Sequence, residues 1–158
     1  MKRLPDLPLE TKLLATATLI YAGISLLMGF GYVLQAHQGT EGYGIHASEI
    51  AALYTGPGAG VTTLISLAHI HLLGLLPVFA IVGFIFVYAT LPKVWKIVLP
   101  LVPFVAFFID VASWFLTKFV AYDFVYLVIG GGAIFISALG LMIVLSLFDI
   151  WFGRRTAA

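Results

Sequence analysis

Four long apolar runs constrain this chain more than any other feature of its sequence. They extend over residues 13–35, 62–88, 94–117 and 124–152. A helix needs about 20 mostly apolar residues to cross the hydrocarbon core of a bilayer, so each run predicts one membrane-spanning helix. We therefore expect an all-α integral membrane four-helix bundle that forms a single membrane domain over residues 1–158, with the lipid bilayer as its surroundings.

Composition excludes the soluble classes of protein. Hydrophobic residues make up 62% of the chain and charged residues only 9%, whereas roughly 25% of an average soluble domain is charged. A soluble domain of this size could not bury so much apolar surface. The net charge of +1 gives no field that would attract nucleic acid. The absence of cysteine excludes disulfides, iron–sulfur clusters and covalently attached c-type haem.

The basic residues predict the orientation of the bundle. If the spans alternate, only Lys118 falls on one side, and the other basic residues fall on the opposite side: Lys2, Arg3, Lys12, Lys93, Lys96, Arg154 and Arg155. The positive-inside rule places the richer side in the cytoplasm, so we expect both termini there. We expect a multi-pass protein of the bacterial inner (cytoplasmic) membrane. Asp149 lies at the cytoplasmic end of the fourth run, where we expect it to pair with Arg154 and Arg155.

The loop at residues 36–61 is the one sizeable segment expected outside the membrane. Residues 48–54 predict a short surface helix that stops at Gly56. Connections of this length usually have a function or a structure of their own. This loop carries His37 and His46, although a solvated cap over the bundle is an equally good interpretation.

Ionisable residues inside the spans mark the candidate site, because they are costly in a bilayer and usually face the bundle interior. His69 and His71 lie in the second run, and Asp110 lies in the third. From the helical rise, all three lie roughly 10 to 14 Å below the outer surface. At the same level lie Met28, Gly29, Gly31, Gly130, Gly131 and Gly132.

The two histidines must have different roles. Positions i and i+2 point about 200° apart on a helix, so His69 and His71 cannot both bind one metal ion from a regular helix. His71 shares its face with Ala68 and Gly74, which leave room for a flat ligand close to the backbone. His69 shares its face with Thr62, Ser66 and Pro77.

A polar stripe in the third run is the second part of the candidate site. Asp110, Ser113, Trp114 and Thr117 recur at helical spacing, so we expect them to face inward, away from lipid. Asp110 would hold the second ring nitrogen of a metal-bound histidine, with Ser113 and Trp114 beside it.

A haem b site is the leading hypothesis from these residues. Neutral imidazole is a usual axial ligand of haem, and we expect His71 in this role, with Gly74, Gly130 and Gly131 giving the macrocycle room. The other spans contain no histidine, so the second ligand stays open. The alternatives are Met28, His37 or His46 from the loop, a histidine from a second copy, or an open coordination position.

Three other interpretations compete with haem. Copper suits imidazole and thioether ligands, which His37, His46, His69 and Met28 would supply. Movement of a proton or solute is a weaker interpretation, because the inner side offers no counterpart to the three ionisable groups. The third is structural: His69, His71 and Asp110 would form a polar helix clasp in a non-catalytic subunit.

Two runs resemble the second and third helices of a family of small four-helix bacterial inner-membrane proteins. They are residues 66–74 (Ser-Leu-Ala-His-Ile-His-Leu-Leu-Gly) and residues 110–118 (Asp-Val-Ala-Ser-Trp-Phe-Leu-Thr-Lys). Residues 3–9 and 148–152 also fit the ends of that family, and the external loop fits least. The shorter pattern His-x-His-Leu is similar to a haem-bearing helix in relatives of the haem–copper oxidases.

The resemblance implies electron transfer near the periplasmic face, because some members of that family carry a c-type haem motif in the first external loop. This chain has no cysteine and departs from the family at that point. The histidine pair and Asp110 are left as the shared features.

These patterns predict a haem b-associated electron-transfer protein or redox-complex subunit with its site near the periplasmic face. Its expected partners are other membrane or periplasmic redox subunits, or further copies of the chain. The alternative is a structural or interaction subunit of a larger membrane complex. The sequence contains no nucleophile–base pair and no phosphate-binding loop, so we do not expect an enzyme on its own.

Overall fold

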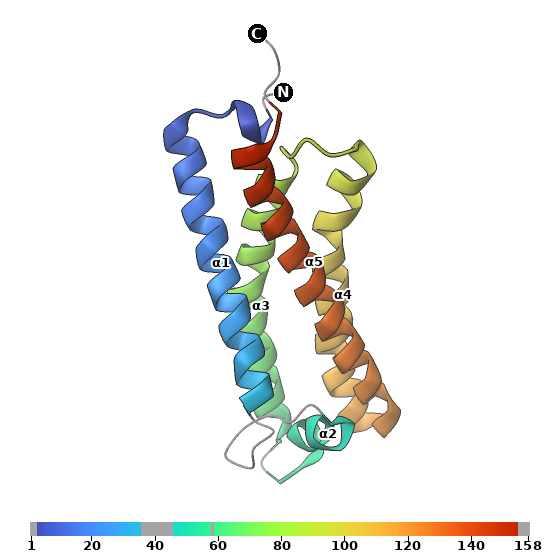
Figure 1. The fold of residues 1–158 in the computed structure, drawn as a ribbon. Coiled ribbons are helices and arrows are strands. Elements are labelled where there is room, and N and C mark those ends of the chain that lie inside the picture. Colours follow the sequence, from blue (N-terminus) through green and yellow to red (C-terminus); the bar gives the residue numbers. More distant parts are fainter. Residues whose placement is uncertain (1–2, 36–45, 58, 155–158) are drawn as a thin grey trace.

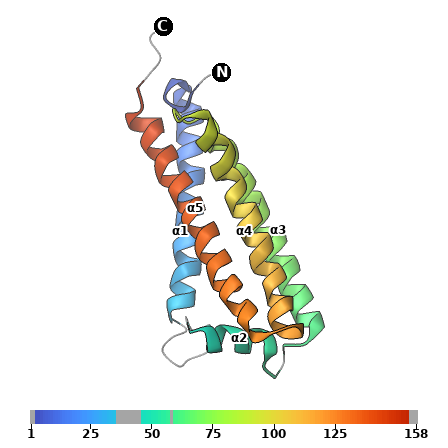
Figure 2. The same ribbon diagram turned by 90° about the vertical axis from the view of Figure 1, so that its right-hand side faces the viewer.

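Four long helices run side by side in the computed structural model, and a short helix lies across one end (Figures 1 and 2). The structure describes residues 3–35, 46–57 and 59–154, and this part of the chain contains no strand. The long helices are α1 (Leu9–Gln35), α3 (Val61–Phe86), α4 (Lys93–Phe119) and α5 (Val125–Phe152), and the short one is α2 (Ala47–Thr55). Two 3-10 turns, η1 (Leu4–Asp6) and η3 (Tyr122–Phe124), precede α1 and α5. The chain is an all-α membrane four-helix bundle, as predicted.

The spans agree with the sequence predictions except at some of their ends. All four helices are long and apolar enough to cross a membrane. The first begins at Leu9 rather than at residue 13, because the ammonium of Lys12 turns back to the carbonyl oxygen of Pro5, 2.7 Å away, and does not interrupt the helix. The second ends at Phe86, and Pro92 is the residue that precedes α4. The predicted surface helix is present as α2, which ends at Gly56.

The first and last described residues, Arg3 and Arg154, lie at the same end of the bundle (Figure 1), as the even number of spans requires. We call this end the basic end. It comprises η1, the connection between α3 and α4, and the end of α5. We call the opposite end, which α2 crosses, the α2 end. The positive-inside rule predicts that the basic end faces the cytoplasm.

Asp149 joins two segments at the basic end. Its carboxylate accepts hydrogen bonds from the backbone N–H of Thr90, at 2.8 Å, and from the hydroxyl of Thr90. Within the described residues, this carboxylate is bound to Thr90 and forms no ion pair with Arg154, so the expected pairing with Arg154 was wrong. Arg155 lies outside the described residues, and the pairing with it stays a prediction. Asp149 holds the connection between α3 and α4 against the end of α5.

Helices α4 and α5 form the most extensive contact in the bundle. Their closest approach is at Gly131, where an added Cβ would lie 2.9 Å from the carbonyl oxygen of Ala106 and 3.0 Å from the Cβ of Asp110. Helices α3 and α4 approach similarly at Gly83, where a Cβ would lie 3.2 Å from the Cβ of Pro100. Small residues let helices pack closely in lipid, where burial of apolar surface contributes no driving force.

Aromatic side chains fill the bundle interior between α3, α4 and α5. Phe79 is fully buried and contacts Phe104, Phe107 and Phe135, with ring centroids 5.5 to 5.7 Å apart. Phe107 also contacts Phe135 at 5.4 Å. These pairs are at the distances typical of favourable aromatic contacts. The middle of the bundle is therefore packed with side chains.

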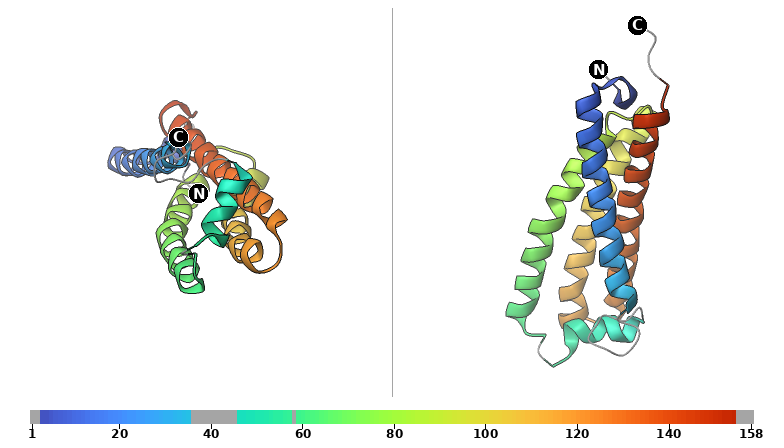
Figure 3. Two further views of the ribbon diagram at one scale, coloured as in Figure 1. Left: turned by 90° about the horizontal axis from the view of Figure 1, so that it is seen from below. Right: turned by 60° about the vertical axis from the view of Figure 1, so that its left-hand side comes forward.

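Helix α1 is the least embedded of the four (Figure 3). It contacts α5 and, less extensively, α3. Its segment near the α2 end is exposed at Leu27, Met28, Gly29, Phe30 and Gly31. The same view shows α2 lying across the ends of the other long helices, and its contacts are with α4 and α5. The polar residues of the candidate site lie beneath α2.

The difference between adjacent glycines of α5 gives a test of this packing. Gly131→Ala should destabilise the protein by about 1–3 kcal/mol, because the new methyl group overpacks the contact with α4. Gly132→Ala should be neutral or stabilising, since a Cβ there meets nothing within 4 Å and alanine favours the helix. Reversible unfolding of both variants in mixed micelles measures the difference. Equal stability of the two variants would contradict the proposed close approach.

Candidate functional site

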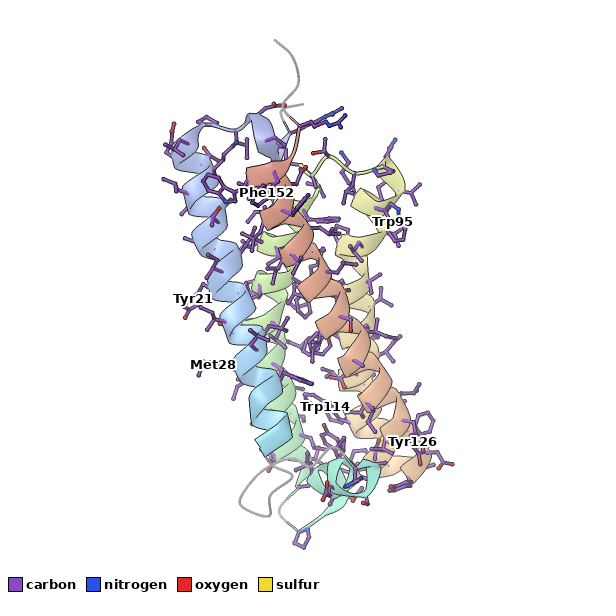
Figure 4. All side chains as sticks on the ribbon, viewed as in Figure 1. Tyr21, Met28, Trp95, Trp114, Tyr126 and Phe152 are labelled. Carbon is purple, nitrogen blue, oxygen red and sulfur yellow. The ribbon has the colours of Figure 1, made fainter. Side chains whose placement is uncertain are left out.

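Trp114 is the centre of the polar layer near the α2 end (Figure 4). Its ring stacks on Tyr54 of α2, with centroids 5.6 Å apart and planes 12° apart. The His71 ring lies nearly perpendicular to it, with centroids 5.3 Å apart and planes 87° apart. Its indole N–H points to the carboxylate of Asp110, with Nε1 and Oδ1 3.4 Å apart. One buried side chain of α4 therefore connects α2, α3 and the carboxylate.

The imidazole of His71 is oriented by its own helix. Its Nδ1 lies 2.9 Å from the carbonyl oxygen of Leu67, one turn earlier in α3. A carbonyl oxygen only accepts hydrogen bonds, so Nδ1 carries the proton and Nε2 of the neutral ring carries the lone pair. His71 is partly buried, and a Cβ at Gly74 would meet nothing within 4 Å. Gly74 is thus exposed on α3, and its use by a flat ligand stays a prediction.

Asp110 is 6% exposed and lies against α5. Gly131 presses on its Cα and Cβ, and the indole of Trp114 donates to its carboxylate. Within the described residues, no hydrogen bond joins Asp110 to either histidine. The expected carboxylate–histidine contact is replaced by an indirect one, in which Trp114 lies between Asp110 and His71.

The polar stripe of α4 faces inward, as predicted. Asp110, Ser113, Trp114 and Thr117 are all buried. The hydroxyl of Ser113 donates to the carbonyl oxygen of Ile109, and that of Thr117 donates to the carbonyl oxygen of Ser113, both at 2.7 Å. Both hydroxyl groups donate to backbone carbonyls of α4 itself. The hydroxyl of Ser113 therefore does not donate to His71.

Other predicted site residues do not gather around His71. Met28 is 72% exposed and points away from the bundle (Figure 4). His69 is exposed on α3. His46 precedes α2, and its backbone N–H donates to the carboxylate of Glu49 at 3.3 Å. His37 lies outside the described residues. In the described part of the chain, no three His, Asp or Glu side chains are grouped so as to hold a metal ion.

The glycines predicted to line the site divide into two kinds. Gly131 is buried in the contact with α4, so the backbone of α4 occupies the space beside it and leaves no room for a ligand. At Gly74 and Gly130, an added Cβ would meet nothing within 4 Å. Only the latter two leave room on a helix surface, as a flat ligand would require.

Lys118 is a structural residue of this layer that the sequence did not assign. Its ammonium donates to the carbonyl oxygen of Tyr54, at 3.1 Å, and to that of Ala59. The last carbonyl groups of a helix have no partner within that helix, and the Lys118 charge satisfies the end of α2. Lys118 and Trp114 are one turn apart on α4, so one face of α4 holds α2 by its backbone and by Tyr54. The signal in the sequence was a single basic residue on the predicted outer side.

Removing the ammonium of Lys118 should loosen α2. Lys118→Met loses two charge-assisted hydrogen bonds, each worth about 1.5–3 kcal/mol. The amides of α2 should therefore exchange with deuterated solvent at least tenfold faster, as hydrogen-exchange mass spectrometry in detergent would measure. Lys93→Met, at an exposed position of the basic end, is the matched control and should leave α2 unchanged. Unaltered exchange in the Lys118 variant would show that other contacts hold this helix.

The comparisons with known proteins agree with this architecture. No curated protein and no solved structure matches the chain. A protein-family model described as a transmembrane helical domain matches residues 57–157, which comprise α3, α4 and α5. This match covers well over half of the chain and includes His71, Asp110 and Trp114. The chain therefore belongs to the Aq_1264_TM family of transmembrane helical domains.

Proposed function

We propose that this chain is a membrane subunit that binds haem b at His71 and takes part in electron transfer near the α2 end. The observation that carries the proposal is the orientation of the His71 ring. Nδ1 donates to the carbonyl oxygen of Leu67, which leaves Nε2 as the ligating atom. Metal-bound histidines almost always donate their other ring N–H to a carbonyl, carboxylate or water.

The lack of a hydrogen-bond donor at Nε2 of His71 among the described residues is a second reason to propose a ligand there. No residue in the described part of the chain donates a hydrogen bond to this atom. An iron ion bound at this position would give the Nε2 lone pair a partner. The contact with Trp114, with ring centroids 5.3 Å apart, restricts rotation of the His71 ring.

The shape of the site favours a ligand at the surface of α3. The interior toward the basic end is occupied by the rings of Phe79, Phe107 and Phe135. The open positions are beside Gly74 and Gly130. The open position at Gly74 therefore supports a flat ligand on this side of α3, at the boundary between the bundle and lipid or a neighbouring chain.

The residues that would hold the group have separate roles. His71 would bind the iron, the Leu67 carbonyl orients the His71 ring, and Gly74 would leave room for the ligand. Haem b supplies reversible one-electron transfer when bound. Because Met28 points away from the bundle, a second ligand would come from His37 or His46, from a second copy or from a partner subunit, or no second ligand would be present.

The visible spectrum of the purified protein tests this proposal. Protein from cells supplied with haem should show b-type bands in the reduced-minus-oxidised spectrum. His71→Ala should abolish them. His69→Ala is the matched control, two residues away on an exposed face, and should retain them. Circular dichroism should show the same helical content for both variants, so that loss of haem is separated from loss of fold.

A colourless wild-type protein with intact helical content would overturn the haem proposal. Equal loss of the bands in both histidine variants would overturn the assignment of His71.

A non-catalytic subunit that packs against a larger membrane complex is the second candidate. Its support is an exposed polar face on α3, where Thr62, Ser66 and His69 face outward. Polar and ionisable side chains in a span are costly against lipid and usually face protein. This face would contact another helix.

Site-specific photo-cross-linking tests the second candidate. A photoreactive residue at position 69 should cross-link to protein in the native membrane. The same residue at position 108 is the control, because Phe108 is an exposed apolar residue of α4 and should contact lipid. Cross-links to lipid alone at both positions would count against a subunit contact through α3.

A further inference from the structure

We propose that a pocket at the basic end binds the phosphate headgroup of an anionic phospholipid. The pocket has a volume of about 140 Å³ and lies between η1, the start of α1 and the end of α5. Such a volume is well above that needed to hold one water. Its walls combine one buried cation, Lys12, with the apolar side chains of Leu7, Leu9 and Ile150. The site is separate from His71 and does not depend on the haem proposal.

Lys12 is the residue that selects an anion. Its side chain is 6% exposed, although it carries a full positive charge in the first turn of a membrane span. The ammonium has three donors and no acceptor. One donor meets the carbonyl oxygen of Pro5 at 2.7 Å. In the described part of the chain the other two have no acceptor and no carboxylate lies within ion-pair distance, so a phosphate oxygen would pair with this charge.

The fold builds this pocket from ordered segments. The backbone N–H of Leu4 donates to the carbonyl oxygen of Tyr88 at 3.0 Å, which ties η1 to the end of α3. Pro5 is buried and lies so close to Gly153 that a Cβ there would clash with its ring. The N-terminal turn therefore lies against the end of α5, and Lys12 is enclosed between them.

The surroundings indicate a lipid and not a soluble anion. The walls combine polar and apolar groups, which suits the phosphate and the adjoining glycerol region of a phospholipid. Trp151 also lines the pocket, and its indole N–H donates to the hydroxyl of Thr16 at 3.0 Å, as suits a tryptophan at a membrane interface. Arg3 and Arg154 are exposed at the same end and add positive charge. Basic pockets between spans at the cytoplasmic side are a known way to bind acidic headgroups.

Native mass spectrometry of the full chain tests the proposal. The protein would be released from micelles that contain equal amounts of phosphatidylglycerol and phosphatidylcholine. Wild-type protein should retain phosphatidylglycerol at least about fivefold more than phosphatidylcholine. Lys12→Gln should remove this preference. Lys96→Gln is the matched control, since Lys96 is a basic residue of the same end that does not line the pocket, and it should keep the preference.

Three results would overturn the proposal. The first is equal retention of the two lipids by wild-type protein, a result that does not depend on any variant folding. The second is an unchanged preference in a Lys12→Gln variant with native helical content. The third result comes from adding inorganic phosphate at millimolar concentration to the micelles. If phosphate alone displaces phosphatidylglycerol, the pocket binds a free anion and not a lipid.

Discussion

The close approach of α4 and α5 at Gly131 is the contact on which the candidate site depends. In lipid, two helices gain nothing from burying apolar surface against each other, so they associate through packing and hydrogen bonds. Gly131 lets α5 lie against the backbone of α4 beside Asp110. At this contact Gly131 lies against the Cα and Cβ of Asp110. The carboxylate of Asp110 accepts a hydrogen bond from the indole of Trp114. Trp114 in turn meets His71 on one side and Tyr54 on the other.

The sequence predicted those features that depend on helical period and length. Four apolar runs gave four spans, and the spacing of Asp110, Ser113, Trp114 and Thr117 placed them on one buried face. The partners of individual side chains could not be predicted in the same way. A contact between helices depends on the rotation and axial position of both, and one residue changes these by about 100° and 1.5 Å. His71 therefore has a carbonyl of its own helix as its partner, where the sequence suggested Asp110.

The glycines of α5 illustrate the same limit. The sequence placed three consecutive glycines at the level of the candidate site, and Gly130 and Gly131 were both expected to leave room for a ligand. The structure assigns packing to Gly131 and open space to Gly130 and Gly132. The start of α1 was predicted too late for a related reason, since a hydropathy pattern counts Lys12 as an interruption. The side chain instead turns back to Pro5 and the helix continues around it.

Three charged side chains near the ends of the spans bind backbone groups of other segments. Lys118 binds carbonyl oxygens at and beyond the end of α2, Lys12 binds that of Pro5, and Asp149 binds the N–H of Thr90. Backbone groups at helix ends and turns lack partners within a helix, so a few charges can join segments without ion pairs. This role also bears on orientation. Lys118 is the one basic residue on the predicted outer side, and its contact with α2 gives it a structural reason to be there. The remaining basic residues then agree with a cytoplasmic basic end.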